Sequence, residues 1–408
     1  MELLTHKSLG GPEIIAMCDP SAFTTSIGWF VDTGSRDEPP EIAGISHFLE
    51  HMVFKGTKRR TAEQVNSELD HLGAQSNAFT SEESTVFHAC VLPECQTRAV
   101  DLLTDIMRPS LREEDFDMER QVILEEIAMY DDQPPYGAME RAMELFFGDH
   151  SLSRRVLGTA ETVSEMTIDQ MVKYHKSRYT LDNMFLVASG KVDFEQLVEQ
   201  TESLVGSWRG RSELRQTKLP KFSATDAVIE RPATHQQYTV KIWPGVGCND
   251  PERYALRLLA SVIADESGSR LFWELIDSGL AETAALWPQF FHECGCIVGY
   301  LCCAPEDTEE NIDTINRVLQ QVVDEGVSQR ELDLARNKIV SGLILSDERP
   351  SNRLFAIGQS WLSRRRYDPL DAVLARYAAV TPENLREIAL KTLGVTPTTV
   401  QVVGAPSL

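Results

Sequence analysis

The sequence predicts an α+β fold with two similar halves, each a mostly antiparallel sheet with helices packed on it. Strand and helix periodicities are mixed along the chain and include hairpins, which favours α+β over a doubly wound parallel sheet. The order of elements in residues 1–208 recurs in residues 225–408. Residues 209–224 between them are polar and basic, with Gly210 and Pro220, as is typical of an interdomain linker. A chain of 408 residues is long enough to build two cores.

In the first half, turn and capping signals separate the elements. A loop with Pro39 and Pro40 leads into a helix that contains His47, and Gly56 ends this helix. Thr61 and Gln64 have the form of a capping box, which starts the next helix. In order, the predicted elements are a strand at 26–32, the His47 helix, a helix at 61–72, two strands within 74–92, helices at 93–108 and 112–130, two further helices, and a strand at 183–190.

The second half is predicted to repeat this order. Ser328 and Glu331 form another capping box, which opens a long helix. In order, the predicted elements are a strand at 237–243, helices at 253–263 and 269–277, strands up to residue 303, helices at 307–325 and from 328 onward, and a strand at 399–403. Side-chain similarity between the halves is weak, so the suggested duplication rests on the order of elements.

The stretch from His47 to His51 carries the chemistry that the sequence predicts most sharply. Positions i, i+3 and i+4 of a helix lie on one face, so His47, Glu50 and His51 point the same way. Two imidazoles four residues apart can hold one Zn²⁺, and the carboxylate between them can take a proton from water. The order H-x-x-E-H is the inverzincin signature. On these five residues alone, a polar helix face without metal is an equally good interpretation.

A second acidic helix offers a third ligand. Residues 118–127 have helical periodicity without Gly or Pro, and Glu119 and Glu126 lie two turns apart on one side. Glu126 could complete a His₂Glu site with one position left for water. Glu119 could act as an auxiliary carboxylate beside the ligands. Taken alone, this helix is more often a solvated face.

Composition excludes several classes of partner. Lys and Arg number 39 against 62 Asp and Glu, which gives a net charge of −23 and argues against nucleic acid and anionic membranes. No run of 18 apolar residues exists to span a membrane, and the first residues resemble neither a signal nor a transit peptide. Eight scattered cysteines then favour reduced thiols and a cytoplasmic location. Those between Cys294 and Cys303 flank a strand-like run and are expected to be buried.

Residues 34–38 and 44–57 together strongly resemble the pitrilysin-type zinc metallopeptidases, in particular the short bacterial branch similar to the mitochondrial processing peptidase. Residues 76–80, the helix from Glu119 to Glu126 and residues 156–162 also match. The resemblance covers both halves and is most specific in the first. It implies two α+β halves that close like a clamshell around a chamber for unfolded peptides.

The resemblance also implies roles for individual residues. His47, His51 and Glu126 would hold one zinc ion per chain, Glu50 would be the general base, and Glu119 the second catalytic carboxylate. Glu125 competes with Glu126 as ligand, but Glu126 matches the family position. The segment Asn77-Ala78-Phe79 would lie on an exposed strand edge where a peptide substrate adds as another strand.

One departure from the family pattern lies in the second half. Active relatives usually carry an Arg and a Tyr seven residues apart there, ending in Gly-Leu-Ala-Tyr. In this chain Ile276 stands at the Arg position, Glu282 replaces the Tyr, and the segment is one residue short. Losing a phenol that stabilises an oxyanion costs on the order of 3 kcal/mol unless another group replaces it. Arg270 is a candidate substitute, although an Arg at a helix start is more often structural.

The expected function is that of a zinc metalloendopeptidase acting on short or unfolded peptides. The main alternative is a non-catalytic or partner-dependent peptide-binding subunit, which the altered second half favours. A homodimer or a paired family subunit is also expected, because a partner could supply the missing Arg and Tyr. A zinc hydrolase of another amide or ester is a further alternative.

Overall fold

The computed structural model describes residues 1–8, 11–213, 215 and 218–404. The chain forms two compact units. Unit 1 comprises Met1–Ala128, Arg154–Gln216 and Leu345–Tyr367, and unit 2 comprises Met129–Ser153, Thr217–Ile344 and Asp368–Leu408. Each unit has one sheet with helices packed on it, so the predicted α+β class is confirmed. Residues 9–10, 214, 216–217 and 405–408, which fall within the predicted halves and linker, lie outside the described residues.

Unit 1 is built on a six-stranded sheet with the order β1-β2-β6-β3-β5-β4. All neighbouring strands are antiparallel except β2 and β6, which are parallel. The edge strand β4 therefore has one free side. The strands are β1 (Glu2–Lys7), β2 (Glu13–Cys18), β3 (Thr25–Val31), β4 (Gln75–Thr80), β5 (Thr85–Val91) and β6 (Met184–Gly190).

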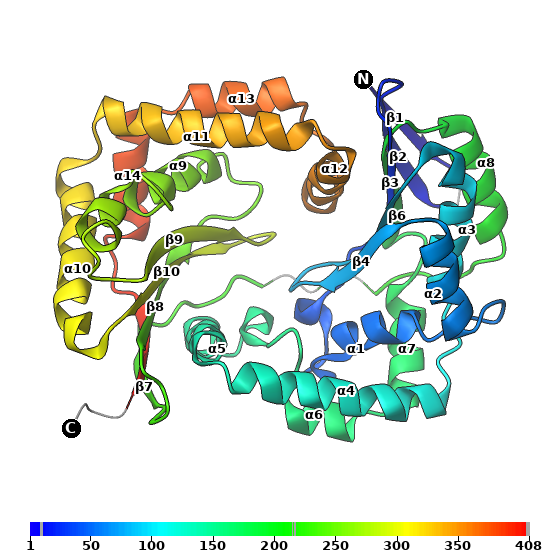
Figure 1. Ribbon diagram of the computed structural model, residues 1–408, viewed down its shortest axis with the longest axis horizontal. Coiled ribbons are helices and arrows are strands. Elements are labelled where there is room, and N and C mark those ends of the chain that lie inside the picture. The colour runs from blue at the N-terminus through cyan, green and yellow to red at the C-terminus, as the bar shows by residue number, and fades with distance from the viewer. Residues whose placement is uncertain (9–10, 214, 216–217, 405–408) are drawn as a thin grey trace. The chain divides into compact units, whose positions relative to one another are not determined.

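The central strand β3 is buried on both faces, because helices cover both sides of this sheet. Ile27, Trp29 and Val31 point into the main core, which the helices of the first half complete. Phe30 points to the other face, where helix α12 (Pro350–Arg364) covers it (Figure 1). Gly358 lets α12 lie this close, since a Cβ there would come within 2.1 Å of the Phe30 ring. The first-half helices are α1 (Ile45–Val53), α2 (Ala62–His71), α3 (Gln96–Ile106), α4 (Glu113–Asp131), α6 (Ala160–Glu165), α7 (Ile168–Arg178) and α8 (Phe194–Val205).

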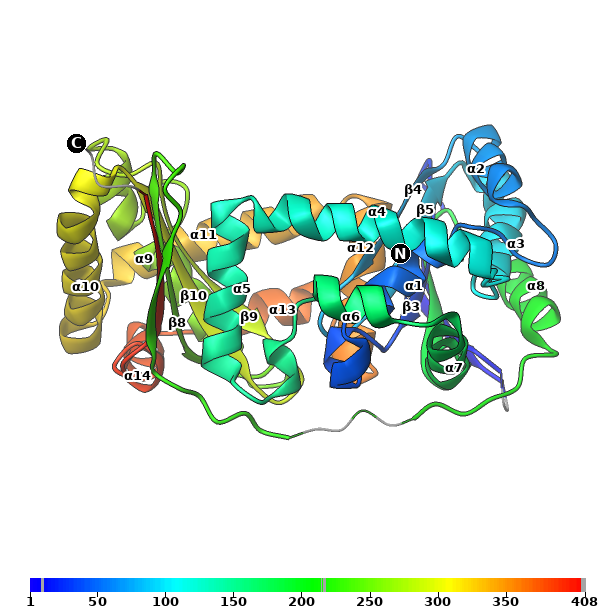
Figure 2. The ribbon, with the colours of Figure 1, turned by 90° about the horizontal axis from the view of Figure 1, so that it is seen from below.

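Unit 2 repeats this plan with a five-stranded sheet in the order β7-β11-β8-β10-β9. One face packs against α9, α10 and α14, and the other packs against α5 (Pro134–Phe147), as Figure 2 shows. Each sheet is thus covered on one face by a helix from the other half of the sequence. The other elements are β7 (Asp226–Glu230), β8 (Gln237–Gly245), β9 (Thr283–Phe290), β10 (Gly295–Cys303), β11 (Thr398–Val403), α9 (Arg253–Ile263), α10 (Thr308–Glu325), α11 (Gln329–Asp347), α13 (Leu370–Ala378) and α14 (Pro382–Thr392).

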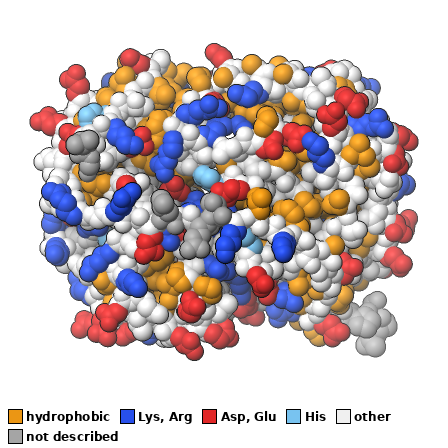
Figure 3. Space-filling model, turned by 180° about the vertical axis from the view of Figure 1, so that it is seen from behind, with side chains coloured by type: hydrophobic (Ala, Val, Ile, Leu, Met, Phe, Trp, Pro, Cys, Tyr) orange, Lys and Arg blue, Asp and Glu red, His pale blue; other side chains and the backbone are white. Residues whose placement is uncertain are grey.

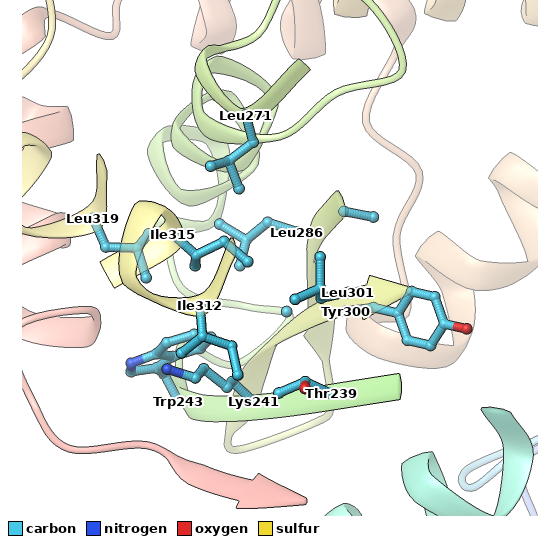
Figure 4. A pocket seen from close by; sticks show the side chains of 12 residues that line it. Thr239, Lys241, Trp243, Leu271, Leu286, Tyr300, Leu301, Ile312, Ile315 and Leu319 are labelled. Carbon is cyan, nitrogen blue, oxygen red and sulfur yellow. The ribbon is translucent and has the colours of Figure 1, made fainter. Parts of the chain in front are cut away.

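A small apolar cavity of about 20 Å³ lies between the sheet of unit 2 and α10 (Figure 4). Its walls are mainly aliphatic and aromatic side chains, among them Trp243 and Leu286. Two polar residues of β8 also line it. The Lys241 ammonium donates to Asn316 Oδ1 at 2.7 Å, whereas the Thr239 hydroxyl is buried and has no hydrogen-bond partner among the described residues.

Two local features go beyond what the sequence pattern predicted. The helix predicted at 269–277 contains a π-helix, Phe272–Ile276, whose wider turn often marks a functional segment. The predicted linker is anchored at Arg215, whose guanidinium is bonded to Asp37 at 2.8 Å and lies 3.1 Å from Asp32. This part of the linker is therefore fastened to unit 1.

Candidate metal centre

Helix α1 presents a polar face because its other face is packed into the core of unit 1. Phe48, Leu49 and Met52 are buried, and the Phe48 ring stacks on Phe116 of α4 with ring centroids 4.5 Å apart. The intervening His47, Glu50 and His51 are half-buried on the adjoining side of the helix. Helical spacing and the α1–α4 contact together bring these side chains toward α4.

Two imidazoles and one carboxylate converge at this face. His47 Nε2 lies 3.8 Å and His51 Nε2 lies 3.7 Å from the same oxygen, Oε2 of Glu126. One donor atom from each of the three residues falls within 4.8 Å of the others. Two nitrogens and one oxygen are the donor set of many catalytic zinc sites. Tetrahedral bonds to zinc would place donors about 3.3 Å apart, so each of the two histidine–glutamate distances is within about half an ångström of the value that this ion needs.

Glu125 and Glu126, the two candidates for the third ligand, are separated clearly. Glu126 belongs to the cluster. The neighbouring Glu125 is exposed on α4 and forms no part of it. Consecutive residues of a helix point about 100° apart, so only one of the two can face α1.

The two histidines are held in different ways. His51 donates from Nδ1 to Glu119 Oε1 at 2.9 Å, which leaves Nε2 directed at Glu126. The Nδ1 atom of His47 is buried and has no hydrogen-bond partner among the described residues. Burial, together with the charge of His51, lowers the pKa of His47 to about 4, so its imidazole is neutral at physiological pH. A neutral imidazole is the form that binds a metal ion.

Glu119 orients His51 without being part of the ligand cluster. It is buried, at 4% exposed, and its second oxygen pairs with the Lys55 ammonium. Burial alone would raise the pKa of Glu119, but the hydrogen bonds from His51 and Lys55 outweigh it and hold this pKa below its usual value. For His51, burial lowers the pKa while Glu119 and the other nearby carboxylates raise it, with a net rise. The carboxylate thus fixes both the ring and the tautomer of His51.

Glu50 lies beside the ligands and is positioned by the edge strand. Thr80, the last residue of β4, donates its hydroxyl to Glu50 Oε2 at 2.6 Å. Burial raises the pKa of Glu50, partly opposed by this hydrogen bond. A carboxylate with a raised pKa is suited to take up and release a proton near neutral pH.

Asn77, Ala78 and Phe79 lie on β4, the outer strand of the sheet. Ser81 bonds its partner Ser84 across the β4–β5 turn, so the alternation of antiparallel pairs turns the N–H and C=O of Ala78 toward the free side. The Asn77 side chain accepts from this Ala78 N–H at 2.9 Å. The Phe79 ring lies on the face of the sheet that α12 covers, and its centroid is 5.8 Å from that of Phe355 in this helix. The structure therefore offers an open backbone edge at this segment.

The second-half residues that depart from the family pattern all lie in unit 2. The guanidinium of Arg270 is bonded to Glu331 at 2.7 Å and to the Gly326 carbonyl, so its role is structural. Ile276 ends the π-helix, and Glu282 is exposed and accepts from Gln236. Among these residues, only Arg270 carries a positive charge, and that charge is already paired.

Two residues of the site were not assigned from the sequence. Lys55 follows His51 by four residues, so helical spacing alone could have placed it on the same face. Thr80 gave no such signal, because its contact with Glu50 depends on how β4 passes α1. The remaining histidines show no clustering with the site among the described residues; His175, for example, is buried against the Met107 carbonyl.

On the face drawn in Figure 3, acidic and basic side chains are intermingled. No helix in the described ranges combines the length and apolar character needed to cross a bilayer.

Comparisons with known proteins agree on one family. Residues 14–160 match the family model described as "Insulinase (Peptidase family M16)", and residues 165–339 match "Peptidase M16 inactive domain". An uncharacterized zinc protease of Streptomyces coelicolor is 31% identical over 404 residues, which cover 97% of this chain and 88% of the relative. The uncharacterized zinc protease YmxG of Bacillus subtilis is 29% identical and covers 93% of each chain.

Solved structures show the same fold. A protease from Helicobacter pylori matches with a TM-score of 0.92 at 20% identity and covers 98% of this chain and 99% of its own. A structure from Pseudomonas fluorescens, described as a peptidase M16 inactive domain, matches with a TM-score of 0.91 at 16% identity, covering 100% and 99%.

Proposed function

The chain belongs to the M16, or insulinase, family of peptidases, and from this premise we propose that it is a zinc-dependent metalloendopeptidase for short or unfolded peptides. The observation that carries the proposal is the convergence of His47 Nε2 and His51 Nε2 on one oxygen of Glu126, beside Glu50. The zinc-protease names of the relatives support a metallopeptidase role in general. The cleavage of internal peptide bonds goes beyond those names and belongs to the proposal.

The protein residues divide the chemistry among themselves. A zinc ion held by His47, His51 and Glu126 would supply Lewis acidity, which polarises a carbonyl and lowers the pKa of water. Glu50 takes one proton from the attacking water as the new C–O bond forms. It then gives this proton to the leaving nitrogen as the C–N bond breaks. The raised pKa of Glu50 suits both steps.

The edge of β4 supplies the binding geometry. An extended peptide placed along β4 would pair with the outward N–H and C=O of Ala78 once the Asn77 amide swings aside. Thr80 joins the end of this strand to Glu50, so a peptide bound there runs toward the general base. This recognition uses the peptide backbone, which accounts for a preference for extended chains over folded proteins.

The proposal is tested with zinc-loaded wild-type protein and the Glu50→Gln variant on a mixture of quenched fluorescent peptides. Metal content is measured on both, and Glu63→Gln, an exposed change on α2, is the matched control. Loss of the general base is expected to reduce the rate by about 10²–10⁴-fold, with zinc retained. Chelation should abolish cleavage, and added zinc should restore it. Blank-level signal from wild type and Glu50→Gln alike would refute peptidase activity of this chain.

A second candidate function is a peptide-binding subunit that depends on a partner, either a second copy or a paired family member. It is favoured by Ile276 and Glu282 at the Arg and Tyr positions and by the pairing of Arg270 with Glu331. Peptide binding without cleavage by the purified chain, with cleavage restored by a partner, would support it. Full activity of a monomer in light scattering would exclude it.

We also propose a cytoplasmic location. None of the eight cysteines, all of which lie in the described ranges, is joined in a disulfide, which suits a reducing compartment. Cell fractionation that places the protein outside the cytoplasm would contradict this.

A further inference from the structure

The segment Gly34–Glu38 before α1 is unusually polar for its burial. Ser35 is fully buried, Arg36 and Glu38 are 3% exposed, and Asp37 is 8% exposed. Buried charged groups are costly unless they are paired or hydrogen-bonded. The segment belongs to the motif shared with the family, yet none of its residues has a part in the chemistry described above.

Glu38 makes its contacts at the start of the metal-binding helix. Its Oε2 accepts from the Gly44 N–H at 2.7 Å, and its Oε1 accepts from the Ser46 N–H at 2.8 Å. Gly44 is the N-cap residue of α1, has a positive φ of 95°, and has no side chain with which to cap. The first N–H groups of a helix have no partner within the helix, and a carboxylate also interacts favourably with its dipole. Glu38 therefore supplies the cap that α1 lacks.

The same segment is tied to the edge strand. Ser35 N–H donates to the Ser81 carbonyl at 3.2 Å and Arg36 N–H donates to the Glu82 carbonyl at 2.8 Å. The Arg36 guanidinium also pairs with Glu83 in the β4–β5 turn. Residues 34–38 thus connect the start of α1 to the turn that directly follows Thr80.

Of the three proposed ligands, His47 is the one whose position depends most on this end of the helix. It lies three residues after Gly44, in the first turn of α1, and no hydrogen-bond partner for its Nδ1 occurs in the described part of the chain. His51, by contrast, is fixed from the side by Glu119. The position of the His47 ring therefore depends on how firmly the first turn is held.

From these contacts we infer that Glu38 is a positioning residue for the metal centre, which holds His47 in place through the backbone of α1. The inference rests on the proposed zinc site and adds a residue that touches neither the metal nor the substrate. It differs from a purely structural role in one measurable respect. Loss of the cap should reduce the free energy of zinc binding more than it reduces the free energy of unfolding.

The variant Glu38→Gln isolates this role. Burial raises the pKa of Glu38, whereas the Gly44 and Ser46 N–H groups, which both point at its oxygens, favour its charged form. Glutamine keeps the shape of the side chain but offers only one acceptor oxygen, so its NH₂ group faces the other backbone N–H. One of the two capping hydrogen bonds is therefore lost, whatever the protonation state of Glu38 in wild type. Glu41→Gln, an exposed change three residues on, is the matched control. Glu38→Asp keeps both acceptor oxygens on a shorter side chain and should fall between wild type and Glu38→Gln.

Zinc affinity is measured by competition with a chelating indicator, alongside thermal unfolding of the metal-free proteins. Glu38→Gln is expected to raise the zinc Kd by about 10–100-fold, as changes in groups that orient metal ligands do. Glu41→Gln should stay within about twofold of wild type, and kcat of Glu38→Gln should recover at saturating zinc. An unchanged zinc Kd in folded Glu38→Gln would overturn the inference, even if its unfolding temperature drops.

Hydrogen exchange on metal-free wild type keeps the inference testable if the variant does not fold. The Gly44 and Ser46 amides should be strongly protected, and exchange at the rate of open chain would overturn the capping role. The two proposals fail separately. Wild type that binds no zinc refutes the proposed function, whereas equal binding by wild type and Glu38→Gln refutes only the role of Glu38.

Discussion

Replacing Glu119 by glutamine tests how much of the metal affinity comes from outside the three ligands. The change keeps the size of the side chain and removes its charge. It weakens the bond from His51 Nδ1, now 2.9 Å long, and leaves the Lys55 ammonium without its partner. Lys55 is 32% exposed and can turn to water, so its loss should cost little. The expected effect therefore arises mainly at His51.

The magnitude follows from that hydrogen bond. A bond to a charged group contributes about 1.5–3 kcal/mol, and a tenfold change in affinity corresponds to about 1.4 kcal/mol. Glu119→Gln should thus raise the zinc Kd by about 10–100-fold, the usual range for partners of metal-binding histidines. Glu125→Gln, on the exposed side of the same helix, should leave it unchanged.

The pH dependence gives a second readout with a definite sign. Glu119 contributes to the raised pKa of His51, and only the neutral ring binds zinc. In wild type, protons therefore compete with zinc for His51 up to a higher pH than in Glu119→Gln. The difference in zinc affinity between the two proteins should consequently narrow as the pH falls. Isothermal titration against a competing chelator between pH 6 and pH 8.5 measures both quantities. Equal affinity of wild type and Glu119→Gln at pH 8 would refute the orienting role of Glu119.

Two further predictions concern unit 2. Burial raises the pKa of Glu331, but the Arg270 guanidinium and the N–H and hydroxyl of Ser328 outweigh it and lower this pKa to about 2. These contacts therefore stabilise the fold fully above about pH 4.5 and lose this effect as the pH falls toward 2. Glu331→Gln should remove about 1–2 kcal/mol of this acid-labile stability with no change in kcat, and an equal loss of stability in acid for both proteins would contradict it. Thr239→Val should raise the free energy of unfolding by about 1 kcal/mol, because it removes a buried hydroxyl that has no hydrogen-bond partner among the described residues. The apolar cavity beside this hydroxyl offers a water molecule too few polar partners to bind there. Destabilisation of Thr239→Val in urea unfolding would contradict the prediction and show that a bound water satisfies the hydroxyl.

Much of the metal centre could be predicted because its information is local. Helical periodicity alone puts His47, Glu50 and His51 on one face, and the same periodicity aligns Glu119 with Glu126. The meeting of the two helices depends on core packing, such as the stacking of Phe48 on Phe116, which no local pattern encodes. The family resemblance supplied that step, and the structure brings Glu126 to the histidines.

Other features escaped the sequence because their causes are tertiary. The anchoring of Arg215 could not be predicted from its polar neighbours, because its partners Asp32 and Asp37 lie far away in the sequence. The capping role of Glu38 was equally hidden, because a remote carboxylate replaces the usual residue at the N-cap. Strands β1 and β2 were not predicted. They are short segments whose placement depends on pairing with each other and with β6.

The exchange of covering helices between the two halves limits how the chain can be divided. A fragment that stops at residue 208 would lack α12, so the apolar surface formed by Phe30, Phe185 and Val187 would be exposed to water. The complementary fragment would lack α5 and uncover Val240, Val298 and Val400. Exposed surfaces of this kind drive aggregation. Split versions of this protein should therefore be soluble only when both pieces are produced together, so that each returns the missing helix to the other.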